Sequence, residues 1–180
     1  PVISSAASDV YKRQPSWQAN YGMSDDDAVW NFTSYALQQN PNTRIGLAMP
    51  WEDFPLQYDN ASEHRDLTDR GYNLWMNMAG RLSSDFNNAD VFTFYHGEAM
   101  YELRHMYEEG NLSDVSQLMG SSDNSLFTDQ KGHAGQIVID TGTLLWMAAI
   151  HNVEPSSYPE FEDWETDIRV VAQNILSQDN

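Results

Sequence analysis

The chain has 180 residues, with 9 lysines and arginines against 27 aspartates and glutamates, a formal net charge of -18, and no cysteine. A chain this acidic repels nucleic acid and anionic membrane surfaces, so neither is expected as a partner. The composition excludes disulfides and thiolate metal sites. No apolar run reaches the roughly 18 residues that a membrane span needs.

Residues 1–14 do not read as part of a folded domain. The hexapeptide Asp-Val-Tyr-Lys-Arg-Gln at positions 9–14 looks like the in-frame translation of a sequencing-library adapter. We therefore interpret residues 1–14 as a non-native, adapter-like tail, with an ordinary N-terminal tail as the alternative. Residues 15–180 then form a single partial domain, and its natural sequence is expected to extend further upstream.

A helix is expected after a loop at residues 15–23. Ser24 can cap it, and the three aspartates at positions 25–27 favour the positive end of the helix dipole. The helix should run to about residue 39, because Asn40 and Pro41 form a stop. Its inward-facing positions are expected to be Val29, Phe32 and either Ala36 or Leu37.

A short apolar run at residues 44–49 and a run of β-branched and aromatic residues at 90–95 predict strands of a parallel sheet. Ligands of such sheets bind beyond the carboxyl ends of the strands. We therefore expect Trp51 and Glu52, which follow the first strand, and His96, which follows the second, to contact a substrate. The alternatives are a surface loop with Trp51 as a packing lid, and a hydrogen-bonded structural role for His96.

Apolar positions at three- and four-residue spacing predict further helices over residues 61–86, 98–109 and 160–176. Residues 111–119 are expected to form a short turn or helix that leads into a polar loop at 120–124. The inward positions are expected to be Leu67, Tyr72, Trp75, Met76, Met78, Ala79 and Leu82 in the first helix, Met100, Leu103, Met106 and Tyr107 in the second, and Phe161, Trp164, Ile168, Val171, Ala172 and Ile175 in the last.

The stretch at residues 126–152 joins a short loop carrying an acid and a base, Asp129 and His133, to an amphipathic helix. A histidine near the start of a well-anchored helix, with a carboxylate close by to hold its tautomer, is the form of a catalytic dyad. The apolar positions that define the buried helical face are Ala134, Ile137, Val138, Leu144, Leu145 and Ala148.

The order Asp-x-x-x-His-x-Gly, followed by a helix of sequence Thr-Leu-Leu-Trp-Met-Ala-Ala-Ile, resembles the last conserved block of SGNH (GDSL-type) hydrolases. The usual spacing there is Asp-x-x-His, so this chain has one extra residue. The resemblance implies a three-layer α/β/α, flavodoxin-like SGNH hydrolase fold, helix-rich and incomplete, with its N-terminal strands missing. It also implies ester hydrolysis by a Ser-His-Asp triad, with Asp129 and His133 as two of its members.

The third member of such a triad is not evident, because the chain contains neither the Gly-Asp-Ser block nor the Gly-x-Asn-Asp block of that family. We therefore interpret the chain as the C-terminal part of an SGNH-like hydrolase, inactive alone, whose parent cleaves a small-molecule or carbohydrate ester (an acyl or acetylated-sugar ester). The alternative is a non-catalytic α/β binding or interaction domain, in which Asp129 and His133 only mark a helix start. No cofactor is expected, and the acidic residues lack the spacing of a metal site.

Overall fold

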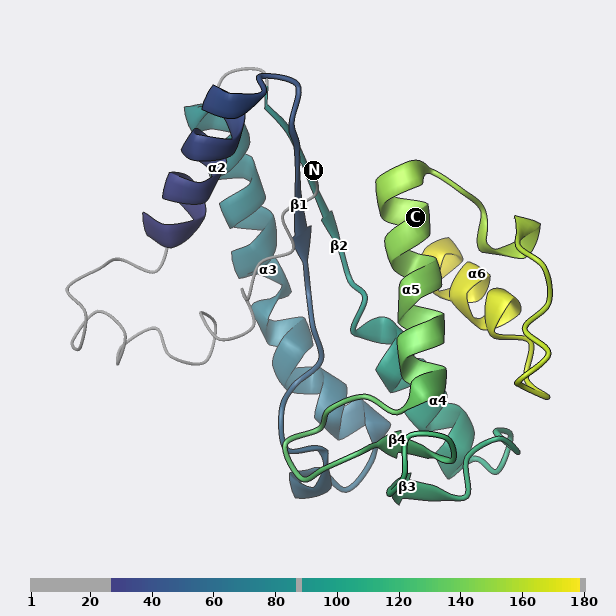
Figure 1. Cartoon of the computed structure of the whole chain (residues 1–180). Coiled ribbons are helices and arrows are strands. Elements are labelled where there is room, and N and C mark those ends of the chain that lie inside the picture. The colour runs from purple at the N-terminus through teal and green to yellow at the C-terminus, as the bar shows by residue number, and fades with distance from the viewer. Residues whose placement is uncertain (1–26, 87–88, 179–180) are drawn as a thin grey trace. The chain divides into compact units, whose positions relative to one another are not determined.

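The computed structural model describes residues 27–86 and 89–178 (Figure 1). The adapter-like tail, the expected loop at 15–23 and the expected cap at Ser24 lie outside these residues. The described chain belongs to the α/β class, with helices and short parallel strands. It divides into two compact units, one containing residues 27–49 and 71–94, the other residues 50–70 and 95–178.

The first unit contains a parallel pair of strands, β1 (Arg44–Ala48) and β2 (Asp90–Phe94). The register places Arg44 opposite Asp90 and Ala48 opposite Phe94, and the first of these pairs is an ion pair with a 2.7 Å Nε–Oδ2 distance. Positions 45–48 of β1 are buried on both faces, as the unbroken apolar run predicts. Both predicted strands and their parallel pairing are therefore confirmed.

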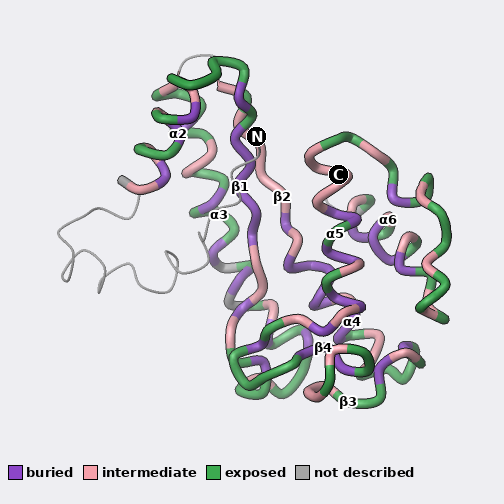
Figure 2. Tube along the Cα trace, in the orientation of Figure 1, coloured by how far each residue is buried: buried purple, intermediate pink, exposed green. Residues whose placement is uncertain are grey.

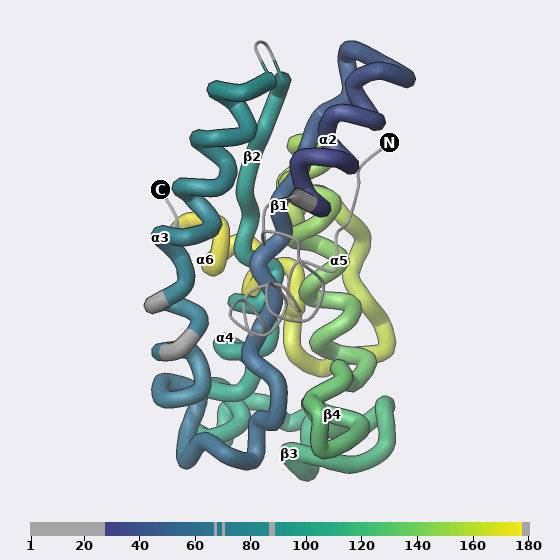
Figure 3. Tube along the Cα trace, turned by 90° about the vertical axis from the view of Figure 1, so that its left-hand side faces the viewer, coloured from purple at the N-terminus to yellow at the C-terminus, as the bar shows by residue number. Residues whose placement is uncertain are grey.

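Two helices accompany this pair, α2 (Asp27–Gln39) and the later part of α3 (Ala61–Asp85). The indole Nε1 of Trp30 donates to Asp85 across 2.7 Å and ties α2 to α3. The hydroxyl of Thr93 lies 3.3 Å from the sulfur of Met76 and ties β2 to α3. Both helices lie on the same side of the strand pair (Figures 1 and 3).

The buried faces of these helices differ in part from the predicted ones. Phe32 of α2 is 61% exposed, and Tyr72 and Met76 of α3 are also exposed, so these three inward predictions are wrong. The residues that are buried instead include polar ones, and a search for spaced apolar residues does not find buried polar positions. The buried stripe of α2 contains Val29, Thr33 and Ala36, and that of α3 contains Ala61, His64, Thr68, Gly71, Trp75 and Leu82.

The second unit is built on three helices that pack against one another, α4 (Glu98–Glu108), α5 (Gln136–His151) and α6 (Ile168–Gln178). Figure 2 shows their buried stretches. Burial of apolar side chains is the main favourable term in packing of this kind. The three helices contribute the following buried apolar residues: Ala99, Met100, Leu103, Ile137, Val138, Leu144, Leu145, Ile168, Val171, Ala172 and Ile175.

Two predictions about this unit are wrong. Residues 111–119, where a short turn or helix was expected, contain a strand, β3 (Gln117–Met119), which pairs in parallel with β4 (Ser125–Phe127). The last helix begins at Ile168 and not near residue 160, because Asp167 caps it by accepting the backbone N–H of Arg169 across 3.1 Å. Short 3-10 turns, η1 (Pro55–Gln57) and η2 (Pro155–Ser157), complete the connections.

Candidate acid–base site

The acid–base loop, residues 129–133, lies between β4 and α5 in the second unit. Oδ2 of Asp129 and Nδ1 of His133 are hydrogen-bonded. The five-residue segment can make this contact because Oδ1 of Asp129 also accepts the backbone N–H groups of Gly132, at 3.0 Å, and of His133, at 3.2 Å. One carboxylate thus closes the turn with one oxygen and holds the imidazole with the other.

Gly132 makes this turn possible. Its φ of +99° lies in a region that L side chains rarely adopt. A Cβ at this position would also lie 2.8 Å from Cδ of Pro55, so the glycine lets the loop lie directly against η1. The loop is therefore shaped by a residue that tolerates both the dihedral angle and the close approach.

The pair faces solvent, with the side chain of His133 66% exposed and that of Asp129 47% exposed. The hydrogen bond from the His133 side chain, and then that from its backbone N–H, lower the pKa of Asp129 to about 2. Asp129 is therefore ionised at neutral pH, and because an ionised carboxylate can only accept, Nδ1 of His133 donates to Oδ2. Nε2 of His133 has no hydrogen-bond partner among the described residues of this unit. The tautomer with its hydrogen on Nδ1 can take a proton at Nε2.

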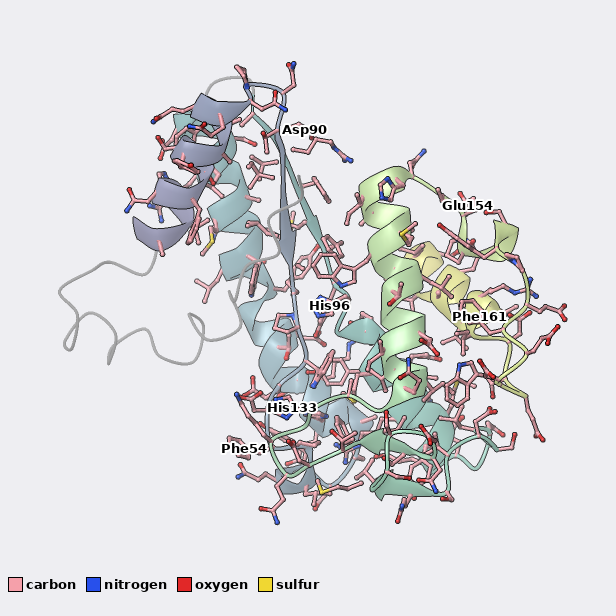
Figure 4. All side chains as sticks on the ribbon, in the orientation of Figure 1. Phe54, Asp90, His96, His133, Glu154 and Phe161 are labelled. Atoms are coloured by element: carbon pink, nitrogen blue, oxygen red, sulfur yellow. The ribbon has the colours of Figure 1, made fainter. Side chains whose placement is uncertain are left out.

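The segment after β1 holds the acid–base loop in place. The indole Nε1 of Trp51 donates to the carbonyl oxygen of Gly132 across 2.9 Å. The backbone N–H of Phe54 donates to the carbonyl oxygen of Lys131, also across 2.9 Å. Figure 4 labels Phe54 and His133 on these two neighbouring loops. Trp51 was predicted to contact a substrate, and the structure places it against the loop that carries His133.

His96 and Trp51, which follow the two parallel strands in the sequence, lie together. Their ring centroids are 5.8 Å apart, and a Cβ on Gly97 would lie 2.6 Å from the carbonyl carbon of Pro50. His96 also contacts Trp146 of α5, with ring centroids 5.5 Å apart. Partial burial lowers the pKa of His96 to about 4, so this imidazole is neutral at neutral pH.

Glu52 is only 7% exposed. Its backbone N–H donates to the hydroxyl of Tyr101 across 2.9 Å, and its carbonyl oxygen lies 2.7 Å from Nε2 of His64. The backbone of Glu52 is therefore fixed to α3 and α4. A substrate contact by the Glu52 side chain stays a prediction, as does one by His96.

A buried polar network, which the sequence did not indicate, lies beneath the β1–α3 loop (residues 50–60). Arg104 of α4, 2% exposed, donates to the carbonyl oxygens of Pro55, at 3.0 Å, and Tyr58, at 2.9 Å. Its Nε donates to Glu108 across 2.7 Å. His64, fully buried, stacks on Tyr58 with a 4.8 Å centroid distance. In the sequence, a histidine or an arginine within a predicted helix is normally expected to face solvent. Only the structure shows that His64 and Arg104 are buried and hydrogen-bonded.

No protein-family model, curated protein or solved structure matches the chain. Within the described part of the chain, every helix is too short or too polar to cross a bilayer. The described residues also contain no group of three or more histidines and carboxylates arranged to hold a metal ion. The acid–base loop and the residues that hold it are therefore the features of this chain that indicate a function.

Proposed function

We propose that this chain is the C-terminal part of an SGNH-like hydrolase that cleaves a carboxylic ester, either an acyl ester or an acetylated-sugar ester. The observation that carries the proposal is the hydrogen bond between Oδ2 of Asp129 and Nδ1 of His133, with Nε2 of His133 left facing outward. A Ser-His-Asp mechanism needs this orientation, because the carboxylate must hold the tautomer whose Nε2 is free to accept a proton.

In the proposed reaction, a serine outside this chain supplies the nucleophile. Nε2 of His133 takes the proton from the serine hydroxyl as its oxygen attacks the ester carbonyl. The same nitrogen then gives that proton to the departing alkoxide, which leaves as an alcohol, and an acyl-enzyme remains. Water, deprotonated by the same imidazole, releases the carboxylic acid and restores the serine. Asp129 stays ionised and stabilises the imidazolium in both steps.

The arrangement of the first unit supports the flavodoxin-like fold that this proposal includes. Crossovers between parallel strands are right-handed, so consecutive crossovers that extend a sheet in one direction place their helices on one side. The positions of α2 and α3 on the same side of β1 and β2 have this form (Figure 1).

A non-catalytic binding or interaction domain is the second candidate. One observation favours it: Oδ1 of Asp129 accepts two backbone N–H groups, a loop-closing role that an aspartate can have without any catalysis. In that case His133 would only form a hydrogen bond with the aspartate that closes the turn, and it would have no catalytic role. The two candidates differ in what the removal of the imidazole does to a reaction rate.

The test begins with the source DNA upstream of codon 15. An open frame that encodes a strand ending in Gly-Asp-Ser is expected, and the extended protein should hydrolyse p-nitrophenyl acetate. In that protein, His133→Ala should lower kcat/KM by at least about 10³-fold, because it removes the general base. The matched control is His105→Ala, since His105 is also exposed and lies 3.3 Å from a carboxylate four residues away, Glu109. Equal rates for the two variants would rule out the catalytic role, as would a start codon directly before residue 1.

A further inference from the structure

The peptide group between Gly132 and His133 is held from both of its ends. Its carbonyl oxygen accepts the indole N–H of Trp51, and its N–H donates to Oδ1 of Asp129. Because a peptide group is planar and rigid, a bond that fixes its carbonyl also fixes the direction of its N–H. The indole of Trp51 is thereby linked, through one rigid unit, to the carboxylate that binds the imidazole.

Rotation of this peptide would remove one of the hydrogen bonds that align the Asp129 carboxylate with His133. If the plane turned away, Oδ1 of Asp129 would lose one of its two backbone N–H donors, that of His133, and the alignment of Oδ2 with Nδ1 of His133 would weaken. Gly132 offers little resistance of its own, since glycine reaches many backbone conformations at similar energy. The backbone N–H groups of Thr128 and Phe54 hold the two flanking carbonyl oxygens, those of His133 and Lys131. The hydrogen bond from Trp51 is the restraint on the carbonyl oxygen of the Gly132–His133 peptide itself.

Trp51 is itself held by groups that do not depend on the acid–base loop. Its ring meets His96 edge to face at 77°, and the next residue, Glu52, is anchored by Tyr101 and His64. Further along the β1–α3 loop, Arg104 fixes the carbonyls of Pro55 and Tyr58. The donor that reaches Gly132 therefore extends from a buried, rigid base.

We propose that Trp51 is a positioning residue for His133: its indole N–H orients the Gly132–His133 peptide and so holds the Nδ1–H tautomer of His133 against Asp129. The term positioning rests on the proposed function, but the orientation itself can be measured in this chain without any turnover. The substrate contact predicted for Trp51 stays a prediction beside this role.

The experiment records the tautomer of His133 by ¹⁵N and ¹³C NMR of the full chain at neutral pH. Trp51→Phe keeps an aromatic ring and removes the donor, and it should lower the fraction of the Nδ1–H tautomer at least two-fold. The control is Trp164→Phe, which removes a similar indole bond of 3.0 Å, to Asp140, and should leave the tautomer unchanged. Thermal unfolding of both variants separates this effect from a general loss of stability.

β-(3-Benzothienyl)alanine at position 51 has nearly the volume of tryptophan but no N–H donor. It tests the same hydrogen bond if the cavity left by Trp51→Phe destabilises the protein. A wild-type tautomer with this residue, or an equal shift in Trp164→Phe, would overturn the proposal. A tautomer that responds only at position 51, in a protein whose extended form hydrolyses no ester, would keep the positioning role and remove only the reaction.

Discussion

Arg104 and His64 are hydrogen-bonded in the interior, with 3.2 Å between Nη1 of the arginine and Nδ1 of the histidine. A guanidinium can only donate, so Nδ1 is the acceptor and the hydrogen of His64 is on Nε2, which donates to the carbonyl oxygen of Glu52. His133 has the opposite arrangement, with Nδ1 donating to Asp129. Two histidines of one chain are thus held in different tautomers, the buried one by an arginine and the exposed one by a carboxylate.

Replacement of the buried guanidinium should be the most damaging change in the second unit. Arg104→Met would leave two carbonyl oxygens and the Glu108 carboxylate without their donor, and removal of one partner from a buried ionic group costs about 3–5 kcal/mol. Urea unfolding should report this loss in the free energy of unfolding.

The control for Arg104 is Arg44→Met, which removes an arginine whose pair with Asp90 is exposed on both sides, at 43% and 60%. Exposed pairs contribute at most about 1 kcal/mol. If both variants unfolded with the same small change, the network beneath the β1–α3 loop would not anchor it.

Phe54 has an unusual backbone conformation, with φ of 58° and ψ of 57° in the left-handed region. For a residue with a Cβ this costs roughly 1–2 kcal/mol, and glycine avoids the cost. Phe54→Gly should therefore be more stable than Phe54→Ala by about 1 kcal/mol in chemical denaturation, because both variants lose the same half-exposed ring and only alanine keeps the strain.

At the nearby position Leu56, the glycine and alanine variants are expected to have the opposite order of stability. It is also exposed, at 56%, and it lies in η1 with an ordinary negative φ. Leu56→Gly should be less stable than Leu56→Ala by roughly 0.5–1 kcal/mol, because glycine loses more backbone entropy on folding. The same order of stability at positions 54 and 56 would contradict the left-handed assignment of Phe54.

His96 should make the chain less stable in mild acid. Burial lowers its pKa from 6.5 to about 4, so between these values the folded chain binds fewer protons than the unfolded chain. Its contribution to the free energy of unfolding is fully present above pH 6.5 and is lost as the pH falls towards 4, by at most about 3 kcal/mol.

The change from pH 7 to about pH 4.5 should therefore destabilise the wild type more than His96→Gln, as measured by urea unfolding at both pH values. His151→Gln, which replaces an exposed histidine at the end of α5, should behave as the wild type. A His96→Gln variant with the wild-type pH dependence would show that His96 is protonated equally easily in the folded and unfolded chain.

Asp129 should report the presence of the imidazole. Because the side-chain hydrogen bond from His133 is the largest cause of its pKa of about 2, His133→Ala should raise that pKa towards 3.8. The rise should stay incomplete, since Oδ1 keeps the N–H groups of Gly132 and residue 133. Carboxyl ¹³C NMR titration measures it directly.

The same pair should also affect stability at low pH. A lowered pKa means that the stabilising contribution of Asp129 is present above pH 3.8 and is lost as the pH falls towards 2. The wild type should therefore lose more stability than His133→Ala across this window, whereas His105→Ala should follow the wild type. No difference between the two variants would mean that the imidazole and the carboxylate are not coupled in solution.

Features that depend on local pattern could be read from the sequence. β1 is an apolar run after Arg44, and β2 is rich in β-branched and aromatic residues. The buried face of α5 has the three- and four-residue spacing of Ile137, Val138, Leu144 and Leu145. Asp129 and His133 are four residues apart, so a short turn is enough to bring them together. In each case the residues that interact are near neighbours in the chain, and residue type and spacing carry the information.

Only the tertiary structure decided what holds that turn in place. Trp51 and Gly132 are 81 residues apart, and nothing in either local sequence indicates the hydrogen bond between them. The burial of His64 and Arg104 could not be predicted from the sequence either, because the spacing of a polar residue in a helix does not show whether it faces water or a buried carbonyl oxygen. A hydrogen bond between distant segments depends on the path of the whole folded backbone, which local spacing does not determine.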